Sequence, residues 1–173
     1  GAGGLGLNAI AIARAMGFEN IIALDIDDAK LESAAQMGAD KTLNSTGGEA
    51  VAETLKEATD NKLFAVLDTF GSEHTGALAV SALAKAGRYV VVGQHGGDFK
   101  IPQIWLPQKA MTVRGSHVGN SGHLRILIDM YRQGKLKAIP VETRPLDQVN
   151  EAIAELESGK VLGRIVFEPT KGV

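Results

Sequence analysis

Hydrophobic residues along the chain follow two periodicities: short unbroken apolar runs and longer stretches with a helical repeat. The run Ile21-Ile22-Ala23-Leu24 is typical of a strand buried on both faces. Leu31, Ala34 and Ala35 lie three and four positions apart, which predicts one apolar face of a helix. The pattern predicts strands over residues 20–25, 41–43, 63–68, 88–92, 111–115 and 164–167, and helices over 5–16, 28–38, 48–60, 75–85, 121–134 and 148–159.

This alternation of strands and helices predicts an α/β fold. Short strands that alternate with helices of roughly ten to fifteen residues form a doubly wound parallel sheet with helices on both faces. We therefore expect both faces of the strands to be covered. In the helix expected after residue 121, Leu124, Leu127, Ile128 and Tyr131 have the spacing of one buried stripe.

A glycine pattern opens the chain, with Gly1, Gly3 and Gly6 in a G-x-G-x-x-G arrangement. In a phosphate-binding turn the first glycine makes the tight turn, the second admits the diphosphate, and the third lets the helix approach the sheet. Such a turn should follow a strand, and none precedes it in this sequence. We therefore expect a piece of a larger protein whose sheet lacks its first strand.

The acidic residue at the end of the next strand strengthens this interpretation. The glycine pattern alone can arise by chance, but here a helix follows it, and Asp25 then ends an apolar strand nineteen residues after Gly6. A carboxylate at this position accepts hydrogen bonds from ribose hydroxyls and repels a 2′-phosphate, which favours NAD over NADP. Asp27 and Asp28 are expected to cap the following helix instead.

Composition excludes several other functions. The 173 residues carry a net charge of −2 without a basic stripe, so nothing indicates a nucleic-acid partner. No apolar run is long enough for a membrane helix, and cytoplasmic localisation is expected. The chain has no cysteine, and its four histidines lack ligand spacing, so we predict no metal site. No group of residues indicates catalysis, so no catalytic residue is predicted either.

Several segments, taken in order, resemble the cofactor-binding half of zinc-dependent, medium-chain alcohol dehydrogenases in their NAD-using branch. The resemblance covers nearly the whole chain, and it is the ordered set rather than any one piece that is specific. The segments are Gly1-Ala2-Gly3-Gly4-Leu5-Gly6-Leu7, Ala23-Leu24-Asp25-Ile26-Asp27, Met37-Gly38-Ala39-Asp40, Leu67-Asp68-Thr69-Phe70-Gly71, Gly87-Arg88-Tyr89-Val90-Val91-Val92-Gly93, Arg114-Gly115-Ser116-His117-Val118-Gly119 and Gly163-Arg164-Ile165-Val166.

The resemblance implies cofactor-binding roles at individual positions. Backbone N–H groups of Gly4 and Leu5 would bind the pyrophosphate, and Arg164 would reach it from the C-terminal segment, although a surface arginine is an equal alternative. Lys30 would lie near the ribose or simply on the helix surface. The remaining implied contacts are Asp25 at the ribose, Ile26 beside the adenine, Thr69 and Phe70 along the cofactor, and Val92, Ser116 and Val118 at the nicotinamide carboxamide.

The resemblance also implies a domain organisation and a parent enzyme. Residues 1–138 would form the NAD-binding Rossmann domain, and residues 139–173 would belong to an absent catalytic domain that supplies zinc and the pocket for a small alcohol or carbonyl substrate. The fragment alone would be inactive. A homo-oligomer is expected through the edge strand near Met111–Val118. The alternatives are a zinc-free, NADPH-using quinone reductase relative, which Asp25 argues against, and a non-enzymatic dinucleotide-sensing module.

Overall fold

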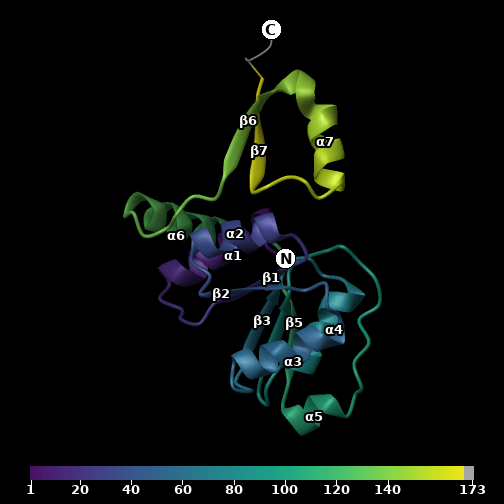
Figure 1. Cartoon of the computed structure of the whole chain (residues 1–173). Helices are drawn as coiled ribbons and strands as arrows, with labels where there is room; N and C mark the ends of the chain where they lie inside the picture. Colours follow the sequence, from purple (N-terminus) through teal and green to yellow (C-terminus); the bar gives the residue numbers. More distant parts are fainter. Residues whose placement is uncertain (170–173) are drawn as a thin grey trace. The chain divides into compact units, whose positions relative to one another are not determined.

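The computed structural model describes residues 1–169 and is an α/β structure with parallel strands in small sheets (Figure 1). The residues pack into two compact units. The sheet unit comprises Gly1 and residues 44–120, and the turn unit comprises residues 2–43 together with the residues from 121 onward. The boundary that we expect between residues 138 and 139 concerns the parent enzyme and stays a prediction.

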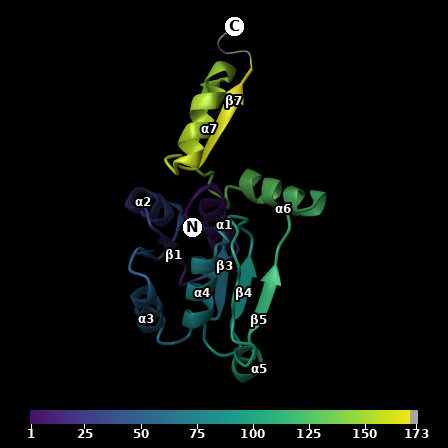
Figure 2. The same cartoon turned by 90° about the vertical axis from the view of Figure 1, so that its right-hand side faces the viewer.

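The sheet unit is built around three parallel strands in the order β3-β4-β5 (Figure 2). Tyr89 of β4 stands opposite Val66 of β3 and Val113 of β5 in the register. This unit confirms the predicted parallel pairing of these segments. Its elements are α3 (Glu49–Ala58), β3 (Ala65–Asp68), α4 (Glu73–Ala82), β4 (Arg88–Val91), α5 (Trp105–Lys109) and β5 (Thr112–Gly115).

The core of the sheet unit lies on one face of this sheet. Tyr89 is fully buried there against Val80 and Leu83 from α4 and its end. Leu67 points to the other face because side chains alternate along a strand, and it is 49% exposed. Within the sheet unit, α4 packs over the face that carries Tyr89.

In the described residues, four α-helices, one 3-10 turn and two short two-stranded sheets make up the turn unit. Strand β1 pairs with β2, and β6 pairs in parallel with β7 next to α7 (Figure 1). The bounds are α1 (Gly4–Ala15), β1 (Ile22–Asp25), α2 (Asp28–Met37), β2 (Lys41–Asn44), α6 (Ser121–Arg132), β6 (Val141–Pro145), the 3-10 turn η1 (Leu146–Gln148), α7 (Val149–Glu157) and β7 (Arg164–Glu168).

Helices α1 and α2 share the core of this unit. Leu7 and Ile10 of α1 belong to one buried cluster with Ala34 and Met37 of α2. The carboxylate of Asp27 accepts a hydrogen bond from the N–H of Ala29 at 2.9 Å, so Asp27 is the cap that begins α2. The predicted end of this helix is confirmed at Gly38, which is left-handed.

Helix α6 forms where the sequence predicts it, but its apolar stripe is not buried. None of its residues is buried, and Leu124 and Tyr131 are each 58% exposed. The predicted burial is wrong because helical spacing places apolar side chains on one face without supplying an element to cover that face. Among the described residues, only Leu127 and Met130 of this helix are even half-buried.

Strand β6 was not among the predicted strands, because polar residues interrupt its apolar pattern. Arg144, the fourth residue of the strand, pairs with Glu142 at 2.6 Å and with Glu155 of α7 at 2.7 Å. The Arg144 guanidinium holds the pKa of each of these carboxyls below its usual range. Ion pairs, rather than an apolar run, therefore tie β6 to α7.

Candidate functional site

The amino end of α1 presents backbone donors that the helix itself cannot satisfy. Gly3 precedes the helix in an extended conformation and provides no side-chain cap. The first helical hydrogen bond runs from the N–H of Leu7 to the carbonyl of Gly3 at 2.9 Å. The N–H groups of Gly4, Leu5 and Gly6 therefore lack a helical acceptor and lie at the positive end of the helix dipole.

Arg164 lies beside this helix end. A Cβ atom on Gly4 would lie 2.5 Å from Nη1 of Arg164 and 2.5 Å from the carbonyl oxygen of Gly163, so only glycine fits there. Gly163 has a φ of +76°, and a Cβ on it would overlap the carbonyl of Pro140. These close approaches bring the start of β7 to the start of α1 within the turn unit. No carboxylate among the described residues pairs with the Arg164 guanidinium, which is exposed.

Asp25 ends β1 and holds the glycine turn. Its Oδ2 accepts a hydrogen bond from the N–H of Ala2 at 2.6 Å, and its Oδ1 accepts one from the N–H of Asp27 at 3.1 Å. The carboxylate thus lies at the turn that precedes α1. The neighbouring Ile26 is 69% exposed, and the space beside Gly3 is open, with no described atom within 4 Å of a Cβ built there.

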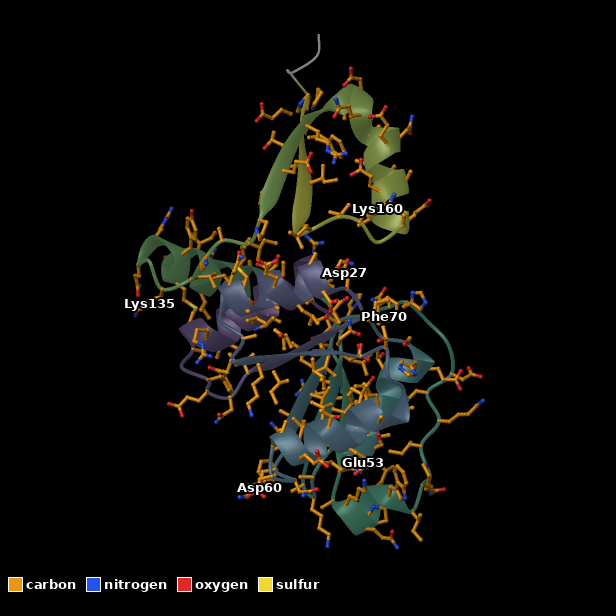
Figure 3. All side chains as sticks on the ribbon, in the orientation of Figure 1. Asp27, Glu53, Asp60, Phe70, Lys135 and Lys160 are labelled. Carbon is orange, nitrogen blue, oxygen red and sulfur yellow. The ribbon has the colours of Figure 1, made fainter. Side chains whose placement is uncertain are left out.

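Lys30 is half-buried on the first turn of α2. Its Nζ would lie 3.8 Å from a Cβ built on Gly159, at the end of α7. The turn unit therefore brings a second cation toward the α7–β7 connection, near Lys160, which Figure 3 labels together with Asp27 at the cap of α2. The predicted role of Lys30 at a ribose stays a prediction.

The other predicted residues follow the strands of the sheet unit. Thr69 and Phe70 come after β3, Val92 after β4, and Ser116 and Val118 after β5. Because the strands are parallel, these residues belong to one edge of the sheet, at its carboxyl end, where ligands bind in open α/β sheets. Each of the three strands in this unit is thus followed by at least one predicted site residue.

Two of these residues have defined side-chain contacts. The hydroxyl of Thr69 donates to the carbonyl oxygen of Gly1 at 2.7 Å. The ring of the half-exposed Phe70, which Figure 3 labels, stacks on the ring of His95 with 4.3 Å between the ring centroids. Phe70 therefore offers one apolar face and is held from the other by the loop after β4.

The backbone fixes what the remaining positions can offer. The N–H of Val92 donates to the carbonyl of Asp68, and the N–H of Ser116 donates to that of Val91, each at 2.8 Å. Only the carbonyl oxygens of Val92 and Ser116 therefore remain as backbone groups for a ligand. Val118 has a φ of +38° and is almost fully exposed.

Asp68 was not among the predicted site residues, yet it is a buried carboxylate at this edge. It is 5% exposed and accepts four hydrogen bonds: 2.7 Å from the hydroxyl of Thr75, 2.8 Å from the hydroxyl of Tyr89, and 2.8 and 3.0 Å from the N–H groups of Gly71 and Phe70. Burial acts to raise the pKa of Asp68, but these hydrogen bonds outweigh it and hold the pKa below its usual value. The same burial and the neighbouring carboxylate raise the pKa of Tyr89.

Neither a metal centre nor a membrane helix is present in the part of the chain that the structure describes. No three histidine or acidic side chains there are grouped so that they could hold a metal ion. Within residues 1–169, no helix combines the length and the apolar character that crossing a membrane requires.

Comparison with known proteins relates this geometry to one family. Residues 4–133 match the family model described as zinc-binding dehydrogenase. The chain is 35% identical over 167 residues to an NAD-dependent alcohol dehydrogenase of Sulfurisphaera tokodaii, and 36% identical over 170 residues to an alcohol dehydrogenase of a Moraxella species. These alignments cover 96% and 98% of this chain but 48% and 49% of the relatives, so the chain spans about half their length.

The fold comparison agrees with the sequence comparison. The crystal structure of the alcohol dehydrogenase from Aeropyrum pernix matches 98% of this chain and 48% of its own, with a TM-score of 0.90 and 32% identity. The structure of benzyl alcohol dehydrogenase from Acinetobacter calcoaceticus matches with a TM-score of 0.85 and 30% identity. The predicted Rossmann-type α/β class is thereby confirmed.

Proposed function

Because the chain belongs to the zinc-binding dehydrogenase family, we propose that it is the NAD-binding part of an alcohol dehydrogenase that transfers hydride between an alcohol or carbonyl substrate and NAD(H). One observation carries the proposal most directly. The guanidinium of Arg164, which pairs with no carboxylate within residues 1–169, lies against the amino end of α1 at Gly4. Backbone donors, a helix dipole and a fixed cation at one place suit a diphosphate.

The turn unit fits the adenosine and diphosphate half of NAD. The N–H groups of Gly4 and Leu5 would donate to the diphosphate, and the open space beside Gly3 admits it. Asp25 already uses its carboxylate to hold the N–H of Ala2, and its remaining lone pairs can accept from ribose hydroxyls. Exposed Ile26 would lie beside the adenine, and Lys30 near the ribose.

The sheet unit would supply contacts to the rest of the cofactor. We assign Thr69 and Phe70 a position along the cofactor, and we assign the carboxamide to the backbone of Val92, Ser116 and Val118. The N–H groups of Val92 and Ser116 already donate to Asp68 and Val91, so these two residues can contribute only their carbonyl oxygens, which would accept from the carboxamide NH₂ group. The N–H of Val118 is then the donor that the carboxamide oxygen needs.

The chain's own residues bind and orient, and none is assigned a catalytic role. When bound, NAD accepts or returns the hydride, while the backbone donors, Arg164 and Asp25 fix its position. We infer that zinc and the substrate pocket belong to other parts of the parent enzyme, and that this chain alone is inactive. We likewise propose that the parent works in the cytoplasm.

Two alternative functions differ in what they predict for this site. A zinc-free quinone reductase relative would use NADPH, and the carboxylate of Asp25 at the turn disfavours the 2′-phosphate of that cofactor. A dinucleotide-sensing module would bind NAD without chemistry. Metal-ligating cysteines and histidines elsewhere in the parent sequence would favour the enzyme, whereas a regulatory or DNA-binding domain would favour the sensor.

A homo-oligomer through the edge strand is the proposed assembly. Strand β5 lies at the sheet's edge, and the N–H groups of Thr112 and Ser116 point inward, to Gly87 and Val91. The N–H of Val113 therefore faces the free edge, because successive N–H groups alternate. Light scattering should show a dimer that Val113→Pro dissociates, since proline removes that outward donor without removing a bond to β4. A monomer at every concentration would contradict the assembly.

Calorimetry on the chain tests the proposed function. NAD should bind more tightly than NADP, and ADP-ribose should retain much of the affinity of NAD because it contains the ribose and diphosphate that the turn unit contacts. Absence of NAD binding, or tighter binding of NADP, would overturn the proposal.

A further inference from the structure

We propose that Asp68 is a positioning residue for the cofactor site, which it serves by fixing Thr69 against Gly1, the first residue of the glycine turn. This inference rests on the proposed function, because it concerns the same site. Asp68 itself is buried, and its carboxylate accepts hydrogen bonds from Phe70, Gly71, Thr75 and Tyr89. Its influence on a cofactor must therefore pass through the residues that it holds.

The carboxylate of Asp68 organises the loop after β3. Two of its four donors, the N–H groups of Phe70 and Gly71, belong to that loop. A third is the hydroxyl of Thr75, which also takes part in the capping box with Ser72 that begins α4. A buried carboxylate without a cationic partner among the described residues depends on such donors, so the loop and the charge stabilise one another.

The backbone of Asp68 joins the same loop to its neighbour. The carbonyl oxygen of Asp68 accepts from the N–H groups of Val92 and Gly93 at 2.8 and 3.0 Å. The two loops touch so closely that a Cβ on Gly71 would overlap the carbonyl of Gly93. Neither loop can therefore move at this point without the other.

Thr69 connects the loop after β3 to Gly1, the first residue of the glycine turn. It lies between Asp68 and Phe70, and its hydroxyl donates to the carbonyl of Gly1 at 2.7 Å. A Cβ on Gly1 would lie 3.3 Å from this hydroxyl and 3.5 Å from Cβ of Phe70, so Gly1 rests directly on the loop. A change in the conformation of the loop thus displaces the first residue of the turn.

Tyr89 separates this role from a role in stability alone. Its hydroxyl is the fourth donor to Asp68, but it comes from the buried core on β4 and not from the loop. Tyr89→Phe therefore removes a core hydrogen bond while it leaves the donors from Phe70, Gly71 and Thr75 in place. This variant is the matched control for lost stability.

The test is a double-mutant cycle in the chain, with NAD affinity measured by calorimetry and Tm by calorimetric unfolding. Asp68→Asn and Thr69→Val should each weaken NAD binding about tenfold, and the double variant should be no weaker than the weaker single variant, because both changes break one chain of contacts. Thr69→Val should leave Tm nearly unchanged. Tyr89→Phe should lower Tm by about 2–4 °C with NAD affinity retained.

Several results would overturn this inference. One is additive losses of affinity in the double variant, and another is full NAD affinity in Thr69→Val. If Asp68→Asn fails to fold, the Thr69→Val and Tyr89→Phe pair still decides, because equal losses of affinity in both variants reduce Asp68 to a stabilising residue. If the unsubstituted chain binds NAD but Thr69→Val and Tyr89→Phe lose the same amount of NAD affinity, only the positioning role is wrong. If the unsubstituted chain binds no NAD, the proposed function is wrong and this inference is wrong with it.

Discussion

The carboxylate of Asp25 accepts a hydrogen bond from the backbone N–H of Ala2 at 2.6 Å, so the acidic residue at the end of β1 holds the turn that precedes α1. The predicted association of the glycine turn with an acidic residue is therefore a direct hydrogen bond within the protein, formed without a ligand. Because the carboxylate is already tied to the turn, little ordering of either group remains to be done when a dinucleotide binds.

Replacing Asp25 should change cofactor preference. Asp25→Ser removes the charge that repels a 2′-phosphate, so the ratio of NAD to NADP affinity should fall about tenfold, which corresponds to about 1.4 kcal/mol. Calorimetric titration with both cofactors measures the ratio. Asp60→Asn removes a charge from an exposed residue that pairs only with Lys62 in the described structure, and it is the control. An unchanged ratio in Asp25→Ser would refute the ribose assignment.

Two glycines of the turn should respond differently to alanine. Gly4→Ala places a Cβ 2.5 Å from the carbonyl of Gly163, so we expect a clear fall in Tm together with weaker NAD binding. Gly3→Ala meets no described atom within 4 Å and should cost at most about 1 kcal/mol of helix capping. Its Cβ fills the space assigned to the diphosphate, so NAD affinity should fall about tenfold or more. Retained NAD affinity in Gly3→Ala would place the diphosphate elsewhere.

Arg164 should matter only for ligands that carry phosphate. Arg164→Ala removes the cation beside Gly4, and NAD affinity should fall about tenfold at low salt and by less as salt screens the charge. Adenosine lacks the diphosphate, and its affinity should not change. Arg125→Ala, at an exposed position of α6, is the matched control. Equal losses for NAD and adenosine would assign Arg164 a general structural role.

The ionisation of Asp68 predicts a dependence of stability on pH. Its pKa in the folded chain lies below the ordinary value for an aspartate, so the unfolded chain binds the proton more readily. The stabilisation is therefore complete above about pH 5 and is lost as pH falls through the folded pKa. Denaturant unfolding between pH 7 and pH 3 should show a shallower acid decline for Asp68→Asn and an intermediate one for Tyr89→Phe. Identical slopes in all three proteins would contradict the assignment.

The sequence predicts most of the elements in this fold because their signals are local. Asp25 could be found from the apolar run that it ends, and Asp27 from its place before a helix. The limits of α4 were harder, because its capping box uses Thr75 at the position where glutamate or glutamine is the usual signal. Strand β6 was missed because Arg144 and its ion pairs, and not an apolar run, secure it.

The features that the sequence does not predict depend on contacts between residues far apart in the chain. Asp68 also ends an apolar run, but the run does not reveal that its carboxylate is buried against Tyr89, which lies 21 positions away on the next strand. The buried stripe expected in α6 has the correct spacing, yet spacing carries no information about a covering surface. The position of Arg164 depends on Gly163 passing close to Pro140, which no pattern within one segment reveals.

Gly4 and Arg164 meet although 160 positions separate them along the chain. A contact of such sequence separation closes a very large loop, so it should form late as the polypeptide folds. During synthesis, the helix start leaves the ribosome long before its arginine does, and the anion-binding surface cannot be complete until translation has passed β7. A nascent chain should therefore gain its full ligand affinity only after β7 has been synthesised.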